Sequence, residues 1–261
     1  MPPVDGQAHH DNRMPPGLAI GVLGRALIFA RVLLWLLLLL GILPLALLWR
    51  LFTRRRVWPQ IYFRGFCAVM GVRLRVHGTP GGNALYLPNH MSWMDIPAIL
   101  AASGSAFVAN DGLAQSPLFR LLAGMNDTVF IARHRRATIG AQVADVRRAV
   151  IDAGALTIFI EGTTSDGTRL LPFKSALLSA LEPLPEGLTV QPVMLRYAEG
   201  AAVAWVGNEP GLNNVRRMLA RVWPIRIDIH FLEPLAGAAL ASRKTMAAAA
   251  HDAIAACMGI G

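Results

Sequence analysis

Cysteine and charged residues are scarce in this chain of 261 residues. Its two cysteines, Cys67 and Cys257, lie far apart, which excludes a disulfide-rich scaffold and a zinc site built on paired cysteines, and favours a reducing compartment. Only 16% of the residues are charged, whereas 54% are hydrophobic. This balance is too apolar for an ordinary soluble domain and indicates association with a membrane.

Acidic residues are the scarcer charged class, because 16 Asp and Glu stand against 25 Lys and Arg and leave a net charge of +9. Such a basic protein binds either nucleic acid or an anionic membrane surface. The sequence has neither zinc-finger spacing nor an aromatic and basic RNA-binding signature, which makes nucleic-acid binding the weaker interpretation. We therefore expect an anionic membrane surface as a partner, and no nucleic acid.

The N-terminal part of the chain divides into a tail and a membrane anchor. Residues 1–17 are polar and contain proline, which predicts a disordered tail. Residues 18–70 form the anchor, in which the uncharged run 32–49, at about 1.5 Å per residue, nearly crosses a hydrocarbon core of about 30 Å.

The later part of the anchor, residues 57–70, has the pattern of an amphipathic interfacial helix. Both a single span and a dip into one leaflet are open. The arginines that follow the run predict a cytoplasmic C-terminal domain.

The rest of the chain, residues 71–261, alternates predicted strands with predicted helices, which indicates an α/β domain. Period-two alternation predicts a strand at 72–76, and short apolar runs predict strands at 84–88, 106–109, 128–131, 156–160, 189–195, 202–206 and 225–231. Helices are expected to start near Ile96 and to cover residues 112–123, 138–152, 212–222 and 242–257. The order of the strands in the sheet cannot be read from the sequence.

The stretch Asn89–Asp95 follows a predicted buried strand and leads into a predicted helix. Catalytic residues are often carried on such connections of a rigid scaffold. If a turn folds Asp95 back beneath His90, the carboxylate fixes the tautomer of the imidazole, and the other ring nitrogen takes a proton from a substrate hydroxyl. The simpler alternative is that Asp95 only N-caps the helix, with Pro97 in its first turn.

Further polar blocks follow other predicted strands. Arg133 ends the segment 130–133, and the turn 161–167 begins with a glutamate and contains glycines and hydroxyls that suit polar substrate groups. The strand 189–195 has a central proline, Pro192, which is typical of an edge strand or a bulge. No Gly-x-Ser-x-Gly elbow occurs, which argues against a covalent acyl-serine intermediate.

Taken in order, these blocks resemble the motifs of the glycerolipid acyltransferase family. Asn-His-x-Ser-Trp-x-Asp at 89–95 is similar to the first motif, and Phe-Ile-Ala-Arg at 130–133 to the second. Glu-Gly-Thr at 161–163, with Pro-Phe-Lys at 172–174, is similar to the third, and the strand 189–195 to the fourth. The resemblance covers roughly residues 72–235. It implies a mixed α/β sheet flanked by helices, at the bacterial inner membrane.

The resemblance implies transfer of a fatty acyl group from a thioester of acyl carrier protein or coenzyme A to the hydroxyl of a membrane lysolipid, without a cofactor or a metal. His90 would be the general base, Asp95 would orient it, and Arg133 would bind the acceptor's phosphate or head group through bidentate hydrogen bonds. The other residues with an expected role in substrate binding are Glu161, Gly162, Thr163, Phe130 and Pro192. Those with an expected supporting role are Asn89, Ser92, Trp93 and Lys174.

Two positions depart from the family's usual pattern. Thr164 stands where an arginine is common, with Arg169 as a substitute charge, and Ala176 stands where a glycine often follows the lysine. This spelling of the third motif is similar to that of lyso-ornithine lipid acyltransferases. The favoured acceptor is 1-acyl-sn-glycerol-3-phosphate, which would give phosphatidic acid, and the alternative is lyso-ornithine lipid. A more distant alternative is a membrane-anchored lipid hydrolase that uses the same His–Asp pair on water.

Overall fold

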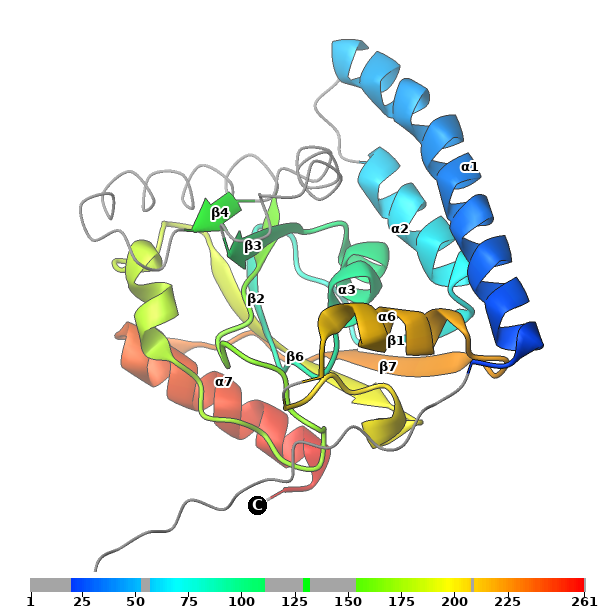
Figure 1. Ribbon diagram of the computed structural model, residues 1–261. Helices are drawn as coiled ribbons and strands as arrows, with labels where there is room; N and C mark the ends of the chain where they lie inside the picture. Colours follow the sequence, from blue (N-terminus) through cyan, green and yellow to red (C-terminus); the bar gives the residue numbers. More distant parts are fainter. Residues whose placement is uncertain (1–19, 53–56, 111–128, 132–153, 208, 261) are drawn as a thin grey trace, which may run out of the picture.

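A computed structural model describes residues 20–52, 57–110, 129–131, 154–207 and 209–260 (Figure 1). The helices are α1 (Val22–Phe52), α2 (Val57–Val69), α3 (Asp95–Ser103), α6 (Gly211–Leu219) and α7 (Arg243–Met258), with short 3-10 helices η3 (Ser175–Leu181), η4 (Gly200–Ala202) and η5 (Gly237–Leu240). The strands are β1 (Val72–His77), β2 (Ala84–Pro88), β3 (Ala106–Asn110), β4 (Val129–Ile131), β5 (Ala155–Thr157), β6 (Thr189–Tyr197) and β7 (Ile225–Phe231).

The described strands form one sheet of seven in the order β1-β7-β6-β2-β5-β3-β4. Strands β6, β2, β5, β3 and β4 are parallel, whereas β7 is antiparallel to β6 and parallel to β1. The sheet is therefore mixed, and the predicted α/β class with flanking helices is confirmed. Parallel strands place their carboxyl ends at one edge of a sheet, which is where ligands bind in such folds.

Strand β2 lies in the middle of the sheet and is buried along its whole length. Because side chains alternate along a strand, Tyr86 joins the core on the side of α3, with Ala98 and Ile99. Leu85 and its neighbour Leu87 join the opposite core, together with residues of α7. Burial on both faces explains why this segment reads as a continuous apolar run, and it makes β2 a rigid base for the residues that follow it.

Helices α1 and α2 form an antiparallel hairpin. Figure 1 shows the two helices side by side, and two contacts join them: Trp35 donates a hydrogen bond of 2.5 Å to the Tyr62 hydroxyl, and the rings of Trp49 and Trp58 meet edge to face with centroids 6.4 Å apart. Residues 22–49 of α1 are long and apolar enough to cross a membrane. The chain thus leaves the domain along α1 and returns to it along α2, whose 13 residues span only about 20 Å.

Several predicted elements differ from the observed ones. The predicted strand 202–206 is wrong, because the carbonyls of Ala202 and Ala204 accept hydrogen bonds from Arg217 of α6 instead of from a neighbouring strand. Strand β5 ends at residue 157 instead of 160, since the Ile160 carbonyl accepts from the Lys174 amide and the chain leaves the sheet. Helix α6 ends at residue 219. The predicted tail and the predicted helices at 112–123 and 138–152 lie outside the described residues.

Candidate active site

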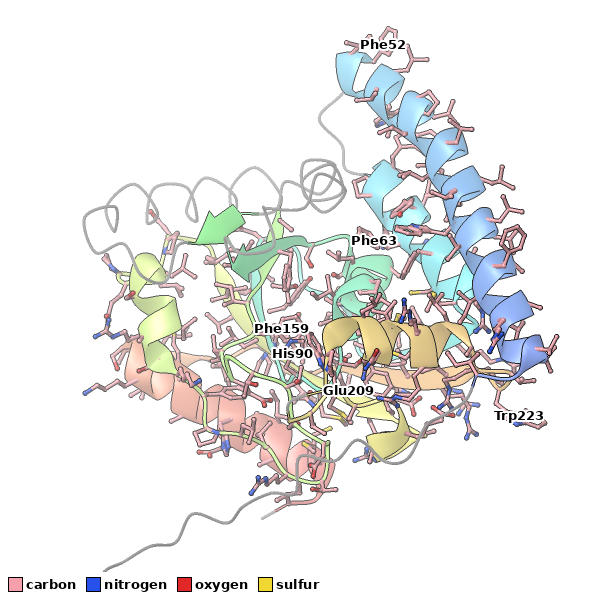
Figure 2. The ribbon with its side chains drawn as sticks, viewed as in Figure 1. Phe52, Phe63, His90, Phe159, Glu209 and Trp223 are labelled. Atoms are coloured by element: carbon pink, nitrogen blue, oxygen red, sulfur yellow. The ribbon has the colours of Figure 1, made fainter. Side chains whose placement is uncertain are left out.

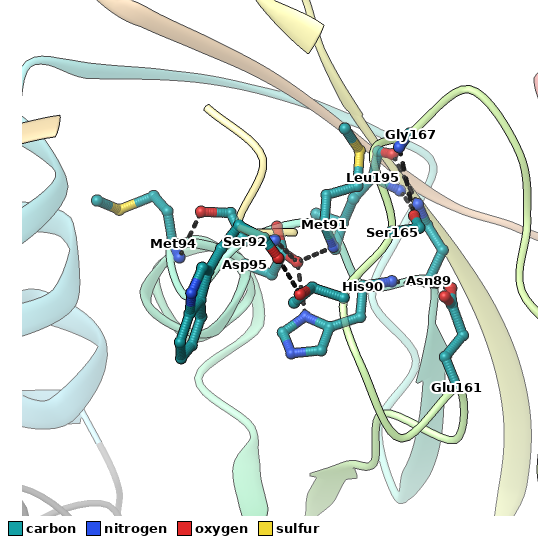
Figure 3. Close-up of polar contacts among 12 residues, drawn as sticks. Asn89, His90, Met91, Ser92, Met94, Asp95, Glu161, Ser165, Gly167 and Leu195 are labelled. Carbon is teal, nitrogen blue, oxygen red and sulfur yellow. Dashed lines mark hydrogen bonds and ion pairs between the residues drawn. The ribbon is translucent and has the colours of Figure 1, made fainter. Parts of the chain in front are cut away.

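The candidate site lies at the carboxyl end of β2, where the chain passes through residues 89–94 into α3 (Figure 3). The neighbouring parallel strand β5 is followed by residues 158–167, which come to the same edge. Two hydrogen bonds join these segments: the Ser165 amide donates to the His90 carbonyl at 2.7 Å, and the His90 amide donates to Glu161 Oε1 at 3.0 Å. The first and third sequence motifs are therefore in direct contact.

His90 and Asp95 are in direct contact, which their spacing in the sequence alone could not decide. His90 Nδ1 lies 2.8 Å from Asp95 Oδ2. The same oxygen accepts hydrogen bonds from the amides of Met91, at 2.7 Å, and Ser92, at 2.9 Å. Since the Asp95 carboxylate acts as an acceptor, Nδ1 carries the proton and Nε2 carries the lone pair. The imidazole is thus held in the tautomer that a general base requires.

The simpler interpretation of Asp95 as an N-cap is wrong. The N-cap position of α3 belongs to Met94, which makes no side-chain capping bond, and Asp95 is the first helical residue. Its carboxylate turns back over the preceding loop and is fully buried, with a side-chain exposure of 0%. A buried charge requires compensating donors, and the amides of the loop together with His90 supply them.

The His90 ring is packed on one face and open at its edge. Its ring centroid lies 4.0 Å from that of Phe159, with an interplanar angle of 24° (Figure 2). The side chain keeps 17% of its surface exposed. Stacking fixes the plane of the imidazole, while the remaining exposure shows that the side chain is not sealed from the surface.

Glu161 is buried behind the His90 backbone, with 1% of its surface exposed. Its Oε1 accepts the His90 amide, whereas Oε2 is buried without a hydrogen bond of normal geometry in the described part of the chain. Burial, together with the negative charge of Asp95, raises the pKa of Glu161 to about 8. At neutral pH this carboxyl group therefore holds its proton, and its observed contact is with the backbone of the loop that carries His90.

The raised pKa of Glu161 predicts a pH-dependent stability. Below pH ~4.5 the group is protonated in both folded and unfolded chains, and between that pH and about 8 only the unfolded chain releases the proton. The free energy of unfolding should therefore fall as pH rises through this window. We expect Glu161→Gln to reduce that fall by on the order of 2–4 kcal/mol, measured by denaturant unfolding at pH 5 and pH 8.

The exposed Glu186 offers a matched control, because Glu186→Gln removes one carboxylate without removing a buried one. That variant should follow the wild type at both pH values. An equal loss of stability between pH 5 and pH 8 in the wild type and in the Glu161→Gln protein would contradict the assignment of a raised pKa to Glu161.

The loop 161–167 is held against the first motif by close packing. The Thr164 hydroxyl donates to the Trp205 carbonyl, and the Trp205 amide donates to the Met91 carbonyl at 2.9 Å. Gly167 has a φ of +79°, and a Cβ there would lie 2.1 Å from Met91 Cε. The positive φ favours glycine at this position, and a larger residue would also displace the flexible end of the Met91 side chain.

Gly162 and Lys174 lie together at the exposed side of the same loop. Gly162 has a φ of +75°, and a Cβ at this position would lie 2.9 Å from Lys174 Nζ. Lys174 itself is exposed, as is Thr163, so both can reach a ligand at the surface. Their expected roles in substrate binding and support stay predictions.

The other residues of the first motif tie the loop to its surroundings. The Asn89 side chain donates to the Leu195 carbonyl at 3.1 Å and accepts the Leu195 amide at 2.7 Å, which continues the sheet beyond the end of β2. Ser92 is buried, and its hydroxyl contacts Met218 Sδ at 3.8 Å. Trp93 Nε1 donates to Asn214 Oδ1 at 3.1 Å. Two of the three residues therefore anchor the loop on α6.

Pro192 does not lie on an edge strand, contrary to the sequence prediction, because β6 is flanked by β7 and β2. The Leu232 amide donates to the Pro192 carbonyl at 3.0 Å, just past the end of β7. The return bond needs an N–H that proline lacks. Gln191 Nε2 donates to the Leu232 carbonyl at 2.8 Å in its place. An interior strand thus accommodates the proline through a side-chain substitute.

The second motif is only partly within the described residues. Phe130 lies in β4, the edge strand, with its backbone in register with Ala109 of β3. Strand β4 is parallel to β3, so its carboxyl end points to the same edge of the sheet as the His90 loop. Arg133 lies outside the described residues, and its expected contact with the acceptor stays a prediction.

Sequence reasoning missed two residues of the site, Tyr197 and Phe159. The Tyr197 hydroxyl donates to Asp95 Oδ1 at 2.5 Å, from the last residue of β6. Phe159 supplies the ring beneath His90. An apolar residue before the third motif and a tyrosine after the fourth carry no signal of their own, because their roles depend on which strands are neighbours.

Three amides of the His90 loop are not available to an oxyanion. Those of His90, Met91 and Ser92 donate to the carboxyl groups of Glu161 and Asp95. Donors for a developing negative charge must therefore come from groups other than these three amides. In the described part of the chain, no three His, Cys, Asp or Glu side chains converge as potential metal ligands.

Comparison with known proteins gives a consistent set of relatives. A family model described as acyltransferase matches residues 73–196. The chain is 38% identical over 157 residues to a lyso-ornithine lipid O-acyltransferase of Rhizobium meliloti (58% of this chain, 54% of the relative). It is 32% identical over 210 residues to the enzyme of that name from Brucella abortus (74% and 78%). A 1-acyl-sn-glycerol-3-phosphate acyltransferase of Neisseria meningitidis is 34% identical over 142 residues (51% and 53%).

Among solved structures, a 1-acyl-sn-glycerophosphate acyltransferase from Thermotoga maritima has the same fold. The TM-score is 0.67 at 17% sequence identity, and the match covers 90% of this chain and 95% of that one. At this sequence identity the likeness shows that the two chains share a fold.

Proposed function

This chain belongs to the acyltransferase family that was expected from its motifs, and we propose that it moves a fatty acyl group from an acyl thioester to the hydroxyl of a membrane lysolipid. The observation that carries this proposal is the His90–Asp95 pair, in which Nδ1 lies on a buried carboxylate and Nε2 is left as a base. The pair lies in the segment that the acyltransferase family model covers.

The proposed reaction has two steps at His90. Nε2 takes the proton from the acceptor hydroxyl while the hydroxyl oxygen attacks the carbonyl carbon of the thioester. The carbon–sulfur bond then breaks, and the imidazolium returns the proton to the departing thiolate. The buried Asp95 carboxylate stabilises the imidazolium between these steps. His90, the acceptor hydroxyl and the thioester account for every proton and bond in these steps. We therefore propose that no cofactor or metal takes part.

We propose lyso-ornithine lipid as the acceptor, in preference to 1-acyl-sn-glycerol-3-phosphate. Relatives named for lyso-ornithine lipid align over as much as 78% of their length, whereas the Neisseria relative aligns over 53%. A phosphate monoester carries up to about two negative charges and favours guanidinium partners, whereas an ornithine head group carries an amine beside a single carboxylate and therefore no net negative charge. Position 164 presents no charge, because threonine is neutral, and its hydroxyl donates to the Trp205 carbonyl.

The direct test is acyl transfer by the purified full-length protein to lyso-ornithine lipid and to lysophosphatidate, side by side and from the same labelled donor. Faster transfer to the ornithine lipid supports the proposal, and faster transfer to lysophosphatidate replaces the proposed acceptor with the other one. Release of free fatty acid without transfer to either acceptor would show that the protein is a lipid hydrolase. Comparing acyl carrier protein with coenzyme A as donor completes the assay, because a basic surface suits both acidic donors.

The acceptor preference predicts the effect of Thr164→Arg. A guanidinium at this position adds charge-assisted hydrogen bonds to a phosphate, each contributing about 1.5–3 kcal/mol. We expect the rate ratio of lysophosphatidate to lyso-ornithine lipid to rise about tenfold. Thr164→Val is the matched control, because it also removes the hydrogen bond to the Trp205 carbonyl but adds no charge. If the rate ratio changed equally in both variants, position 164 would have no part in head-group recognition.

We propose that the α1–α2 hairpin dips into one leaflet of the inner membrane. Both ends of the hairpin return to the domain, and the roughly 20 Å of α2 are too short to recross a core of about 30 Å. The apolar window of α1 is not covered by the rest of the described chain. This arrangement keeps the catalytic domain on the cytoplasmic face, next to anionic head groups, where lysolipids reside.

A further inference from the structure

Tyr197 ends strand β6 directly beneath the His–Asp pair. Its side chain is buried, with 5% of its surface exposed, and its hydroxyl donates to Asp95 Oδ1 at 2.5 Å. Strand β6 is fixed between β2 and β7, so the position of this hydroxyl is set by the sheet and not by a loop. The tyrosine lies outside the residues covered by the acyltransferase family model, which ends at residue 196.

The two oxygens of Asp95 have different partners. Oδ2 faces three N–H donors, on the His90 ring and on the amides of Met91 and Ser92. Among the described residues, Oδ1 receives its hydrogen bond from Tyr197. Without this hydroxyl one oxygen of a fully buried carboxylate would lose its donor, which raises the free energy of the ionised form. Tyr197 therefore stabilises the ionised form of the Asp95 carboxylate. It also stabilises the side-chain rotamer in which Oδ2 points at His90.

We propose that Tyr197 is a positioning residue for the transfer reaction, and that its hydroxyl sets the basicity of His90 through Asp95. The inference rests on the proposed function. By sharing its proton with Oδ1, the tyrosine spreads the negative charge of the carboxylate. In its absence the charge is concentrated on the oxygens next to His90, so the imidazolium is favoured and the active neutral imidazole forms only at higher pH.

The titratable groups around the pair are Tyr197, Cys67 and Glu161. Burial raises the pKa of Tyr197 well above its ordinary value, and burial raises the pKa of the Cys67 thiol to about 12. Both therefore stay neutral across the range in which a histidine titrates. Glu161, with its pKa raised to about 8, titrates in the wild type and in a Tyr197 variant alike. A difference between the two pH profiles therefore reports on the His–Asp pair.

The test is the pH dependence of kcat/KM for Tyr197→Phe in the full-length protein, with Tyr86→Phe as the matched control. Tyr86 is also buried, and its hydroxyl donates to the Gly81 carbonyl at 2.6 Å, so its variant loses a comparable buried hydrogen bond elsewhere in the sheet. Unfolding midpoints of both variants show that the fold survives. The acceptor and donor are those that give the highest wild-type rate.

For Tyr197→Phe we expect kcat/KM at the optimum to fall about tenfold, as for loss of a hydrogen bond to a charged group. The acidic limb of its profile should move up by roughly half to one pH unit. Tyr86→Phe should keep the wild-type limb. A Tyr197→Phe limb that coincides with that of the wild type, or a shift of the same size in both variants, overturns the inference. Absence of transfer by the wild type itself would instead overturn the proposed function.

Discussion

Replacement of His90 by alanine is expected to abolish acyl transfer, with a loss on the order of 10²–10⁴ or more in kcat, the range that a positioned base contributes. The imidazole is the group whose Nδ1 contacts Asp95 and whose other nitrogen carries the lone pair, on a side chain that stays 17% exposed. Alanine leaves no base for the acceptor hydroxyl. The measurement is the initial rate of labelled acyl transfer in detergent or vesicles, with the amount of folded protein determined independently.

A second histidine–aspartate pair in the same chain provides the control. His77 Nε2 lies 3.4 Å from Asp228 Oδ1 at an exposed position, on strands β1 and β7. His77→Ala should keep a rate close to that of the wild type. If His90→Ala retained turnover within a few-fold of the His77→Ala protein, the general-base mechanism would be wrong. The comparison separates the specific effect at His90 from a general effect of losing a histidine paired with an aspartate.

Asp95→Asn should reduce kcat by on the order of 10³, while the fold is retained. The amide oxygen of asparagine can take the three N–H donors that Oδ2 now accepts, and its NH₂ can donate to the Tyr197 hydroxyl. Hydrogen bonding survives, but the negative charge that stabilises the imidazolium is lost. In this variant the rate of transfer should therefore fall, while the unfolding midpoint should stay close to that of the wild type.

Asp95→Ala gives the contrasting case. It leaves the buried amides of Met91 and Ser92 without their acceptor, so both the rate and the stability should fall. Asp228→Asn, at the exposed pair, should change neither. A rate for Asp95→Asn close to that of Asp228→Asn would show that the charge of Asp95 has no part in the reaction, and that its role is confined to the geometry of the loop.

Most of the fold could be predicted from local patterns. The apolar run 84–88 became the buried central strand, and the alternating segment at 72–76 became β1. The strand predictions failed where side chains, instead of the backbone of a neighbouring strand, supply the hydrogen bonds. Residues 202–206 are apolar and resemble a strand, but donors from α6 satisfy their carbonyls. No local pattern reports such a donor, because it comes from a helix that follows later in the chain.

The sequence by itself determined the chemistry that this chain can perform. His90, Asp95 and Glu161 can be recognised from residue type and spacing, and the uncharged run at 32–49 predicts the anchor, because both are properties of short segments. Only the tertiary structure decided that Asp95 turns back to His90, that Glu161 holds the His90 backbone, and that Tyr197 completes the carboxylate's hydrogen bonds. The order of the strands brings these groups together, and that order depends on contacts between segments far apart in the chain.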